Sequence, residues 1–231
     1  DVVLLDVPYA GDEAVKRAHQ LGIKVLALDY DGTVAPEMSI SLQSIRRVPA
    51  ETRALSGVEY AIIRDEIRAQ GTVHEVTDEV LVIVGGGDFD GLTQRIVERL
   101  PGMPLCVIQG PSGLPFETAR SDVRVLVNPP DLPRLMARCA WGVTTGGTTM
   151  LEMLCLGKAI HVVPRTDAEQ VFAERFSDQG ALLGMGLESL RKPTGEQIAA
   201  CEQRGPKLVD GRGCERIAAA IRQPGGEQAV Q

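Results

Sequence analysis

The stretch of the chain that most constrains its fold runs from residue 141 to residue 164 and reads WGVTTGGTTMLEMLCLGKAIHVVP. An apolar run, 141–143, stops at two threonines and two glycines. Apolar residues at helical spacing follow at positions 150, 151, 154 and 155, and a second apolar run, 159–163, begins just after Gly157. This order of strand, glycine turn, helix and strand predicts a βαβ unit within a parallel sheet.

The glycine turn of this unit has the chemistry of an anion site. Backbone N–H groups at the start of a helix lack partners, and the helix dipole favours negative charge there. Gly146 and Gly147 would let a ligand approach the backbone closely, and Thr148 and Thr149 would add hydroxyl donors. Glu152 shares a helix face with Thr148, about 6 Å further along the axis. Its carboxylate could accept both hydroxyls of a ribose, so we expect the unit to bind a nucleoside diphosphate.

Two simpler interpretations compete with this one. A glycine pair before a helix also occurs in α/β proteins that bind no nucleotide, and an exposed helix glutamate is often only solvated. The chain also lacks the three spaced glycines of the dinucleotide motif and the lysine pattern of the phosphate loop. The local pattern therefore makes nucleotide binding a hypothesis that needs support from the rest of the chain.

Composition excludes several other functions. The 231 residues suffice for one large or two small domains, and 44% of them are apolar, as in an ordinary globular protein. A net charge of −7 argues against nucleic acid or an anionic membrane as the partner. No apolar run reaches the roughly 18–20 residues of a membrane span. Five widely spaced cysteines predict reduced thiols and a cytoplasmic protein.

Strands alternate with helices along most of the chain, which predicts an α/β fold with a mostly parallel sheet. We expect a partial N-terminal α/β domain with a linker over residues 1–78 and a Rossmann-like nucleotide-binding domain over residues 79–231. Besides the βαβ unit, the expected strands are 2–5, 23–28, 58–63, 80–84, 105–108, 123–127 and 181–183, and the expected helices are 12–21, 92–100, 132–139, 167–176, 195–203 and 213–222. Asp12 is the expected N-cap of the first helix.

A second glycine-rich loop, residues 85–88, follows the predicted strand 80–84 directly. Ligands of open α/β sheets bind at the carboxyl ends of the strands, so this loop should lie at the same edge as the glycine turn. A tight turn needs one glycine rather than three. We therefore predict that Gly86, Gly87 and Asp88 line the nucleotide site.

A third loop, residues 165–170, reads RTDAEQ and follows the strand that ends near Pro164. It should also reach the carboxyl edge of the sheet and lead into a helix. Glu169 and Gln170 could then donate or accept hydrogen bonds that recognise a sugar or a base. An ordinary first helical turn, which is often acidic, explains the same residues equally well.

The string VLALDYDGTV, residues 25–34, resembles the nucleophile motif of haloacid-dehalogenase phosphatases. The resemblance implies that Asp29 attacks phosphorus, that Asp31 acts as acid and base, and that Mg²⁺ offsets the charge. That family also needs a later lysine and a distal acidic pair, for which Asp88 and Asp90 are poorly spaced. A strand end followed by a turn explains the string without any catalysis.

The order of the glycine-rich pieces resembles the nucleotide-binding half of glycosyltransferase-B-type proteins, above all the UDP-sugar hydrolase of pseudaminic acid biosynthesis and related polysaccharide-biosynthesis proteins. The residues that carry the resemblance are 85–88, GGGD, then 147–152, GTTMLE, then 155–157, CLG, then Glu169 and Gln170, and more loosely 55–64, LSGVEYAIIR. The resemblance implies a glycosyltransferase-B-like fold that binds UDP or a UDP-sugar with neither a cofactor nor a metal ion. It also implies a role in surface-glycan or sugar biosynthesis.

One part of the family pattern is missing. Family members begin with a glycine-rich loop that carries a catalytic histidine, and this chain has no Gly-x-Gly-His segment. Glycosyl chemistry needs a base or an acid near the anomeric carbon, so the catalytic residue stays unassigned. The alternatives are a glycosyltransferase, a subunit of a split enzyme, and a non-catalytic binding protein.

The expected first strand, 2–5, begins almost at the first residue and would leave an edge of its sheet bare. Bare edges pair with other strands. We therefore expect the N-terminal portion to be truncated and completed by a preceding segment, by a partner subunit, or by a second copy in a homodimer.

Overall fold

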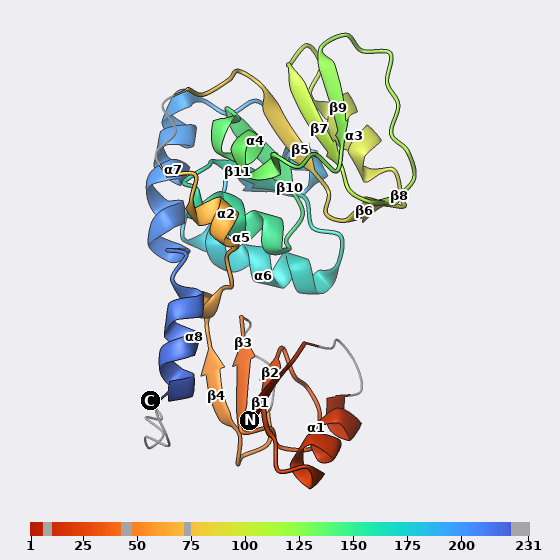
Figure 1. Cartoon of the computed structure of the whole chain (residues 1–231). Coiled ribbons are helices and arrows are strands. Elements are labelled where there is room, and N and C mark those ends of the chain that lie inside the picture. The colour runs from red at the N-terminus through yellow and green to blue at the C-terminus, as the bar shows by residue number, and fades with distance from the viewer. Residues whose placement is uncertain (7–10, 43–47, 72–74, 223–231) are drawn as a thin grey trace. The chain divides into compact units, whose positions relative to one another are not determined.

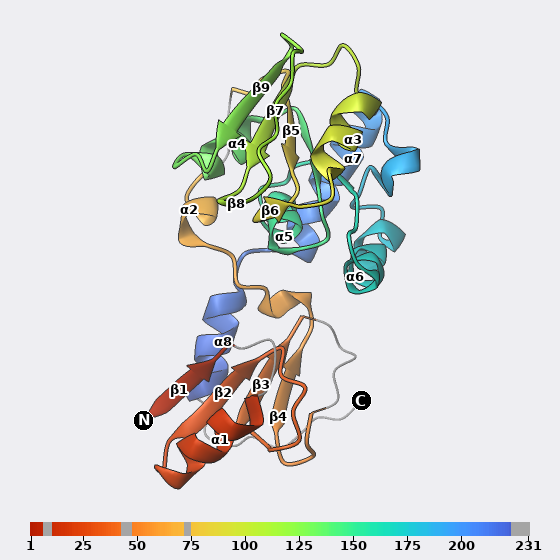
Figure 2. The same cartoon turned by 90° about the vertical axis from the view of Figure 1, so that its right-hand side faces the viewer.

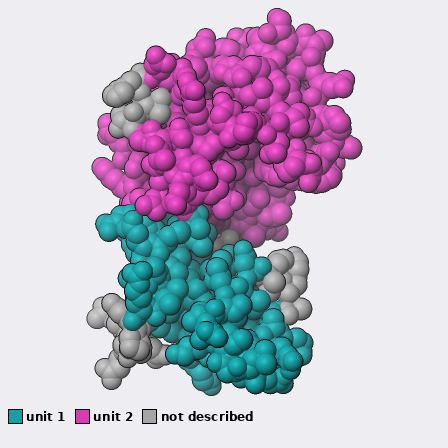
Figure 3. Space-filling view, in the orientation of Figure 1, with its two compact units in different colours: residues 1–62, 212–231 teal, residues 63–211 magenta. Residues whose placement is uncertain are grey.

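The computed structural model describes residues 1–6, 11–42, 48–71 and 75–222 (Figure 1). Contacts divide the chain into two compact units, which we call unit 1 (residues 1–62 and 212–231) and unit 2 (residues 63–211) (Figure 3). The sequence analysis expected one boundary after residue 78, with all later residues in the second domain. The structure instead places the boundary after residue 62 and returns the C-terminal helix to unit 1.

The described residues of unit 1 form a parallel sheet of four strands in the order β1-β2-β3-β4. The elements are β1 (Val2–Leu5), α1 (Gly11–Gln20), β2 (Lys24–Leu28), β3 (Met38–Ser41), β4 (Arg53–Ser56), the 3₁₀ turn η1 (Val58–Tyr60) and α8 (Gly213–Arg222). Alternate residues of β2 face opposite sides of the sheet. Val25 and Ala27 pack against α1, whereas Leu26 packs with Ile217 and Ala220 of α8, so the two helices cover opposite faces (Figures 1 and 2).

The predicted strand 58–63 is wrong, because those residues begin with the turn η1, and the strand β4 lies just before it. The strand β3 was not predicted. Its sequence, MSIS, has polar residues at alternate positions, which is typical of a strand with one solvated face. In the structure Ser39 and Ser41 are both buried, so the polarity of β3 concealed a central strand.

The described residues of unit 2 form a six-stranded parallel sheet in the order β12-β11-β10-β5-β7-β9. Its strands are β5 (Val80–Ile83), β7 (Leu105–Gln109), β9 (Val123–Val127), β10 (Trp141–Thr144), β11 (Ile160–Val162) and β12 (Gly184–Met185). The other elements are α2 (Asp65–Arg68), β6 (Gly87–Asp88), α3 (Leu92–Arg99), β8 (Ser112–Gly113), α4 (Leu132–Arg138), α5 (Thr148–Cys155), α6 (Asp167–Asp178), η2 (Leu187–Ser189) and α7 (Gly195–Leu208). Buried aliphatic residues of β5, β7 and β10 form the core, as expected for a sheet covered on both faces.

The predicted βαβ unit is confirmed as β10, α5 and β11, with β10 and β11 parallel and adjacent. The expected strand 181–183 lies slightly too early, since β12 covers Gly184–Met185. The segment that was expected to be a linker contains α2, in which Ile67 is fully buried. That burial explains why the segment belongs to unit 2.

The order of the strands defines where a ligand would bind in unit 2. From β5 the chain moves outward through β7 and β9, then returns to β10 on the other side of β5 and continues outward to β11 and β12. The direction of winding therefore reverses between β5 and β10. In doubly wound sheets the crevice for a ligand lies at the carboxyl ends of the two strands on either side of such a reversal.

Candidate functional site

The structure brings together the loops that follow β5, β10 and β11. Ile83, Thr144 and Val162 are register partners across these adjacent strands, so the three loops begin at the same level of the sheet. The loops after β5 and β10 are also close to each other, because a Cβ built on Gly85 would lie 4.0 Å from the Oγ1 of Thr145. The predicted convergence of the three glycine-rich or polar loops at one edge is therefore what the strand order produces.

The loop after β10 contains two glycines with different roles. A Cβ at Gly146 would lie 2.8 Å from the Cβ of Glu169, so this glycine is required by packing. A Cβ at Gly147 would meet no atom of a described residue within 4 Å. Gly147 is the N-cap of α5 and has no side chain with which to cap that helix. The start of α5 thus combines open space with backbone donors that the N-cap residue does not satisfy, beside Thr148 and Thr149.

The loop after β5 repeats this division of roles. A Cβ at Gly87 would lie 2.5 Å from the backbone oxygen of Ser112, because β6 pairs closely with β8. A Cβ at Gly86 would meet no atom of a described residue within 4 Å. Gly86 and Gly147 therefore leave room for a ligand, one on each of these two loops.

Asp88 has a structural role at the start of α3. Its Oδ2 accepts a hydrogen bond from the N–H of Thr93 at 2.7 Å, and its Oδ1 accepts one from the N–H of Leu92 at 3.1 Å. Partial burial raises the pKa of Asp88, but the bonds from Thr93 and Leu92 outweigh it and hold that pKa at about 2. The side chain predicted to contact a nucleotide is thus already an acceptor for the helix.

Glu152 is buried, so it is not the solvated helix glutamate of the simpler interpretation. It is only 6% exposed. Both carboxylate oxygens accept bonds from Arg64, Oε1 from Nε at 2.6 Å and Oε2 from Nη2 at 3.0 Å. The contact with Glu152 raises the pKa of Arg64, which directly precedes α2. Each carboxylate oxygen keeps a further lone pair, so a ligand hydroxyl can still be accepted.

Arg64 is a site residue that the sequence analysis did not assign. It lies in the segment 55–64 that resembles the hydrolase, but 88 positions separate it from Glu152. A bidentate pair between a buried carboxylate and an arginine fixes the orientation of the carboxylate. The signal that could have found it is the lone arginine at the end of an apolar run, AIIR, at the entrance to unit 2.

Glu169 ties the loop after β11 to the loop after β10. Its Oε2 accepts hydrogen bonds from the N–H of Arg165 at 2.8 Å and from the N–H of Gly146 at 3.4 Å. The hydroxyl of Thr166 caps α6 by accepting a bond from the N–H of Glu169. Gln170 lies on the exposed side of α6 and donates to Glu174 at 2.8 Å. In this structure both predicted sugar-reading residues are bonded to other protein groups, Glu169 to two neighbouring loops and Gln170 to its own helix.

Arg165 joins two of the three loops and was treated in the sequence analysis only as the start of its loop. Its Nη1 donates to the backbone oxygen of Gly87 at 3.0 Å, and its Nη2 lies 3.8 Å from Oδ1 of Asp90. The side chain is only 29% exposed. Arg165 therefore places a positive charge where the loops after β5 and β11 meet.

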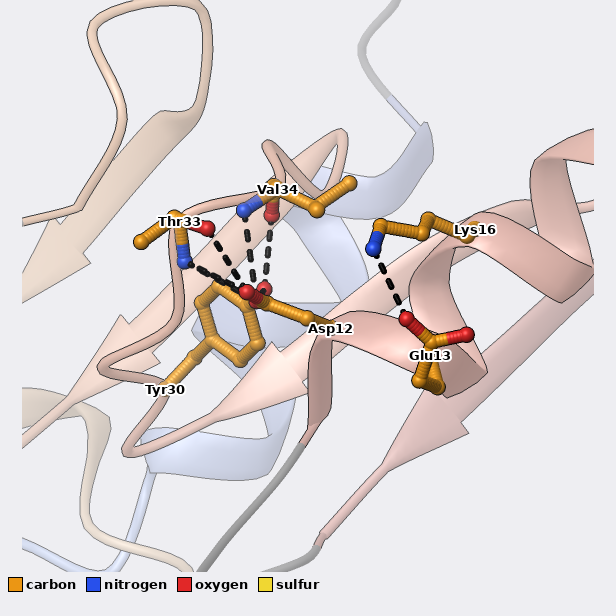
Figure 4. A network of polar contacts seen from close by, with 6 residues as sticks. All are labelled: Asp12, Glu13, Lys16, Tyr30, Thr33 and Val34. Carbon is orange, nitrogen blue, oxygen red and sulfur yellow. Dashed lines mark hydrogen bonds and ion pairs between the residues drawn. The ribbon is translucent and has the colours of Figure 1, made fainter.

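The DYDGT segment of unit 1 forms a polar network around Asp12 (Figure 4). The hydroxyl of Tyr30 donates to Asp12 and to the backbone oxygen of Val34, and the Oγ1 of Thr33 donates to Asp12 at 2.7 Å. The bond from Tyr30 is the main cause that lowers the pKa of Asp12 to about 2, while burial raises the pKa of Tyr30 to about 12. The N-cap prediction for Asp12 is wrong, because α1 already begins at Gly11. The carboxylate of Asp12 instead accepts hydrogen bonds from Tyr30 and Thr33 in the loop after β2.

The same segment gives no support to the phosphatase alternative. Asp29 accepts a hydrogen bond from Ser41 at 3.0 Å and has a left-handed backbone, with φ of 45°. Such a phosphatase needs several carboxylates around Mg²⁺. Within the described residues no group of three or more His, Cys, Asp or Glu side chains could hold a metal ion. The network in Figure 4 explains why aspartate, tyrosine and threonine occur there.

Comparisons with known proteins agree with this architecture. No protein-family model matches the chain. The spore coat polysaccharide biosynthesis protein SpsG of Bacillus subtilis is 22% identical over 257 aligned residues, which cover 96% of this chain and 76% of SpsG. The crystal structure of Acinetobacter baumannii MurG superposes with a TM-score of 0.61 at 14% identity, over 96% of this chain and 73% of MurG. The fold is glycosyltransferase-B-like.

A structure of Staphylococcus aureus MnaA with UDP is similar to the same extent, with a TM-score of 0.61 at 11% identity over 96% of this chain and 75% of MnaA. The predicted fold class is thus confirmed, and the chain is a distant homologue of SpsG. In the described ranges no helix is long and apolar enough to cross a membrane.

Proposed function

We propose that unit 2 binds UDP or a UDP-sugar at the carboxyl ends of β5 and β10, and that the chain acts in the biosynthesis of a surface glycan. The observation that carries the proposal is the pair of open glycines, Gly86 and Gly147, on the two loops at the reversal of strand order. Two similarities support it. MnaA was solved with UDP, and SpsG is named for polysaccharide biosynthesis.

The diphosphate is proposed to lie against the start of α5. The free N–H groups after Gly147 and the hydroxyls of Thr148 and Thr149 would donate to phosphate oxygens, and the helix dipole favours that charge. The guanidinium of Arg165 adds a positive charge from the neighbouring loop. Gly86 leaves the facing side open for the same group.

The ribose is proposed to contact Glu152. Arg64 occupies one side of this carboxylate and holds it in a single orientation before a ligand arrives. The remaining lone pairs would accept the two ribose hydroxyls. Such pre-organisation lowers the entropic cost of ordering the side chain when the ligand binds. Of the predicted contacts, Glu169 and Gln170 are the most weakly supported, because the bonds they make join protein to protein.

The proposed activity is of the UDP-sugar hydrolase type, with neither cofactor nor metal ion, in the cytoplasm. The spacing of Gly147, Thr149 and Glu152, followed by Cys155 and Gly157, carries this choice over a glycosyltransferase or a split-enzyme subunit, which are the alternatives.

Calorimetry of the whole chain with UDP, UMP and inorganic diphosphate, each with and without Mg²⁺, tests the binding proposal. We expect UDP to bind most tightly and without a requirement for Mg²⁺. A UDP-release assay with UDP-N-acetyl sugars tests the activity separately. Absence of UDP binding at about 1 mM ligand would overturn the proposal, since that corresponds to only about 4 kcal/mol.

A further inference from the structure

A cavity of unit 2 lies at the end of α5 opposite to the proposed nucleotide site, and we call it the Lys158 cavity. Its volume is about 320 Å³. Three elements bring residues to its lining: Lys158 lies between α5 and β11, Ala137 is on α4, and Glu202 is on α7. Leu156 and Val76 add apolar surface. The elements can be followed in Figures 1 and 2.

The two charged residues of the Lys158 cavity are placed by closely packed helices. α7 approaches the backbone of α5, since a Cβ built on Gly205 would lie 2.8 Å from the backbone oxygen of Leu154. The backbone N–H of Lys158 donates to the oxygen of Met153 at 2.9 Å, which fixes the chain where it leaves α5. A ligand would therefore meet Lys158 and Glu202 already in position.

The ammonium of Lys158 is buried without a hydrogen bond. The side chain is only 7% exposed. In the described part of the chain its Nζ forms an ion pair but no hydrogen bond, because Oε1 of Glu202 lies 3.8 Å away, beyond hydrogen-bond distance. The Nζ still reaches the cavity, since it is not one of the unpartnered atoms in the described ranges that have lost all contact with solvent.

The fold explains the charge of Lys158 but not its missing acceptors. The helix dipole favours a cation near the C-terminus of α5, and Glu202 offsets that charge. Neither accepts a hydrogen bond from the three N–H groups of the ammonium. A buried charge is stable when hydrogen bonds as well as a counter-charge surround it, so the position calls for an occupant with oxygen atoms.

The charges of the cavity favour an uncharged occupant. An anion would be attracted by Lys158 and repelled by Glu202 at nearly the same distance. A hydroxyl group suits both residues, because it accepts from Nζ and donates to Oε1 at the same time. Two atoms 3.8 Å apart can both lie about 2.8 Å from one oxygen, so the geometry permits this bridge.

We propose that the Lys158 cavity binds an uncharged monosaccharide, one hydroxyl of which bridges Lys158 and Glu202 while the ring lies on the apolar lining. A sugar ring has both parts that the lining requires, hydroxyl groups at its edge and apolar C–H groups on its faces. The volume is at the lower end of the roughly 300–1,000 Å³ of ligand pockets, which suits one ring. The two ends of α5 are about 12 Å apart, so this site is separate from the nucleotide site and does not depend on the function proposed for it.

The test uses the full chain with ¹³C-labelled lysine and methyl α-D-glucoside as the probe. The chain has five lysines, and the Cε–H signal of Lys158 is identified by its loss in Lys158→Arg. That signal should shift and saturate as the glucoside is added. Saturation-transfer NMR of the glucoside then compares the variants. Lys158→Met should weaken binding at least about tenfold, since a charge-assisted hydrogen bond is lost. The matched control Lys207→Met removes an exposed lysine of α7 outside the cavity and should change affinity by less than about twofold.

Glu202→Gln provides a second test, of the preference for an uncharged ligand. This variant removes the counter-charge and leaves the ammonium in place. Acetate should therefore shift the Lys158 signal in Glu202→Gln, whereas in the unmodified chain the glucoside should bind more tightly than acetate.

Four results would overturn the proposal. The first is a Lys158 signal that does not move up to about 100 mM glucoside, which would leave only water between the two charges. The second is an equal shift with tetrahydropyran, which has the ring but no hydroxyl groups. The third is tighter binding of acetate or inorganic phosphate than of the glucoside to the unmodified chain, or displacement of the glucoside by UDP. The fourth is an equal loss of affinity in Lys158→Met and Lys207→Met. If Lys158→Met does not fold, the titrations of the unmodified chain and of Glu202→Gln still decide.

Discussion

Replacing Glu152 separates the proposed ribose contact from the proposed phosphate contact. Glu152→Ala removes the carboxylate and leaves the start of α5, some four residues earlier, unchanged. Glu152→Gln keeps the volume of the side chain and removes only its charge. Both should weaken UDP strongly and should affect inorganic diphosphate little, because diphosphate has no ribose.

The expected magnitude follows from the geometry. Hydrogen bonds to a charged group contribute about 1.5–3 kcal/mol, which corresponds to about 10- to 150-fold in affinity for UDP. The fold should lose less. The carboxylate of Glu152 is buried, but its partner Arg64 has a side chain that is 50% exposed and can be solvated when left alone. An ion pair of that kind contributes about 1 kcal/mol or less to stability.

Calorimetry with UDP and with diphosphate measures the two affinities, and thermal unfolding measures the stability. Glu98→Ala, which removes an exposed glutamate of α3, is the matched control and should leave both affinities unchanged. Equal loss of UDP and diphosphate affinity in Glu152→Ala, in a folded protein, would refute the ribose assignment. It would show that Glu152 acts only by supporting the helix.

Four further predictions test other parts of the structure. Gly147→Val should abolish UDP binding but leave the melting temperature nearly unchanged, because its Cβ meets open space. Gly146→Val should instead destabilise unit 2, because its Cβ would contact Glu169. If folded Gly147→Val still binds UDP, the turn has only a structural role. Asp29→Asn should leave UDP binding within about twofold, or about 0.4 kcal/mol, and a Mg²⁺-dependent phosphatase activity that this variant removes would restore the rival hypothesis. Asp88→Ala should lower the free energy of unfolding by about 1 kcal/mol near neutral pH through loss of a helix cap. The pKa of Asp88 falls from 3.8 to about 2 on folding, so its stabilisation is present above about pH 4 and is lost towards pH 2. The difference in unfolding free energy between the unmodified chain and Asp88→Ala should therefore shrink towards pH 2. A difference that grows on acidification would contradict this. The chain should self-associate in light scattering and should release UDP from UDP-sugars slowly. Leu4→Lys, on the exposed edge strand β1, should reduce the association. A monodisperse monomer that hydrolyses UDP-sugars rapidly would contradict both expectations.

The parts of the fold that could be predicted from sequence are those with strong local periodicity. The unit β10, α5 and β11 has continuous apolar strands and a glycine at each end of its helix, so neighbours in sequence determine it. The strand β3 was missed because Ser39 and Ser41 are buried through tertiary packing rather than through their own hydrophobicity. Local pattern carries no information about such burial.

The candidate site likewise has one part that could be predicted from the sequence and one part that could not. Loops at the ends of parallel strands can be placed from the strand pattern alone, and Gly86 and Gly147 lie on two such loops. The pair of Arg64 and Glu152 could not, because it joins residues 88 positions apart and depends on how α2 packs. The roles of Asp88 and Glu169 as acceptors for backbone N–H groups were also hidden, since a carboxylate that caps a loop and one that contacts a ligand look alike in sequence.

The packing of α8 on the sheet of unit 1 has a consequence for the order in which the chain folds during synthesis. Leu26 and Ile40 are translated before unit 2, but the helix that covers them, residues 213–222, is translated after unit 2. Unit 2 is complete in sequence before that helix exists. Domains generally fold from the N-terminus as they emerge, yet here the first unit to be translated is the last that can close its core. Nascent chains that stall before residue 213 should therefore expose apolar surface and recruit chaperones, while unit 2 is already protected from proteolysis.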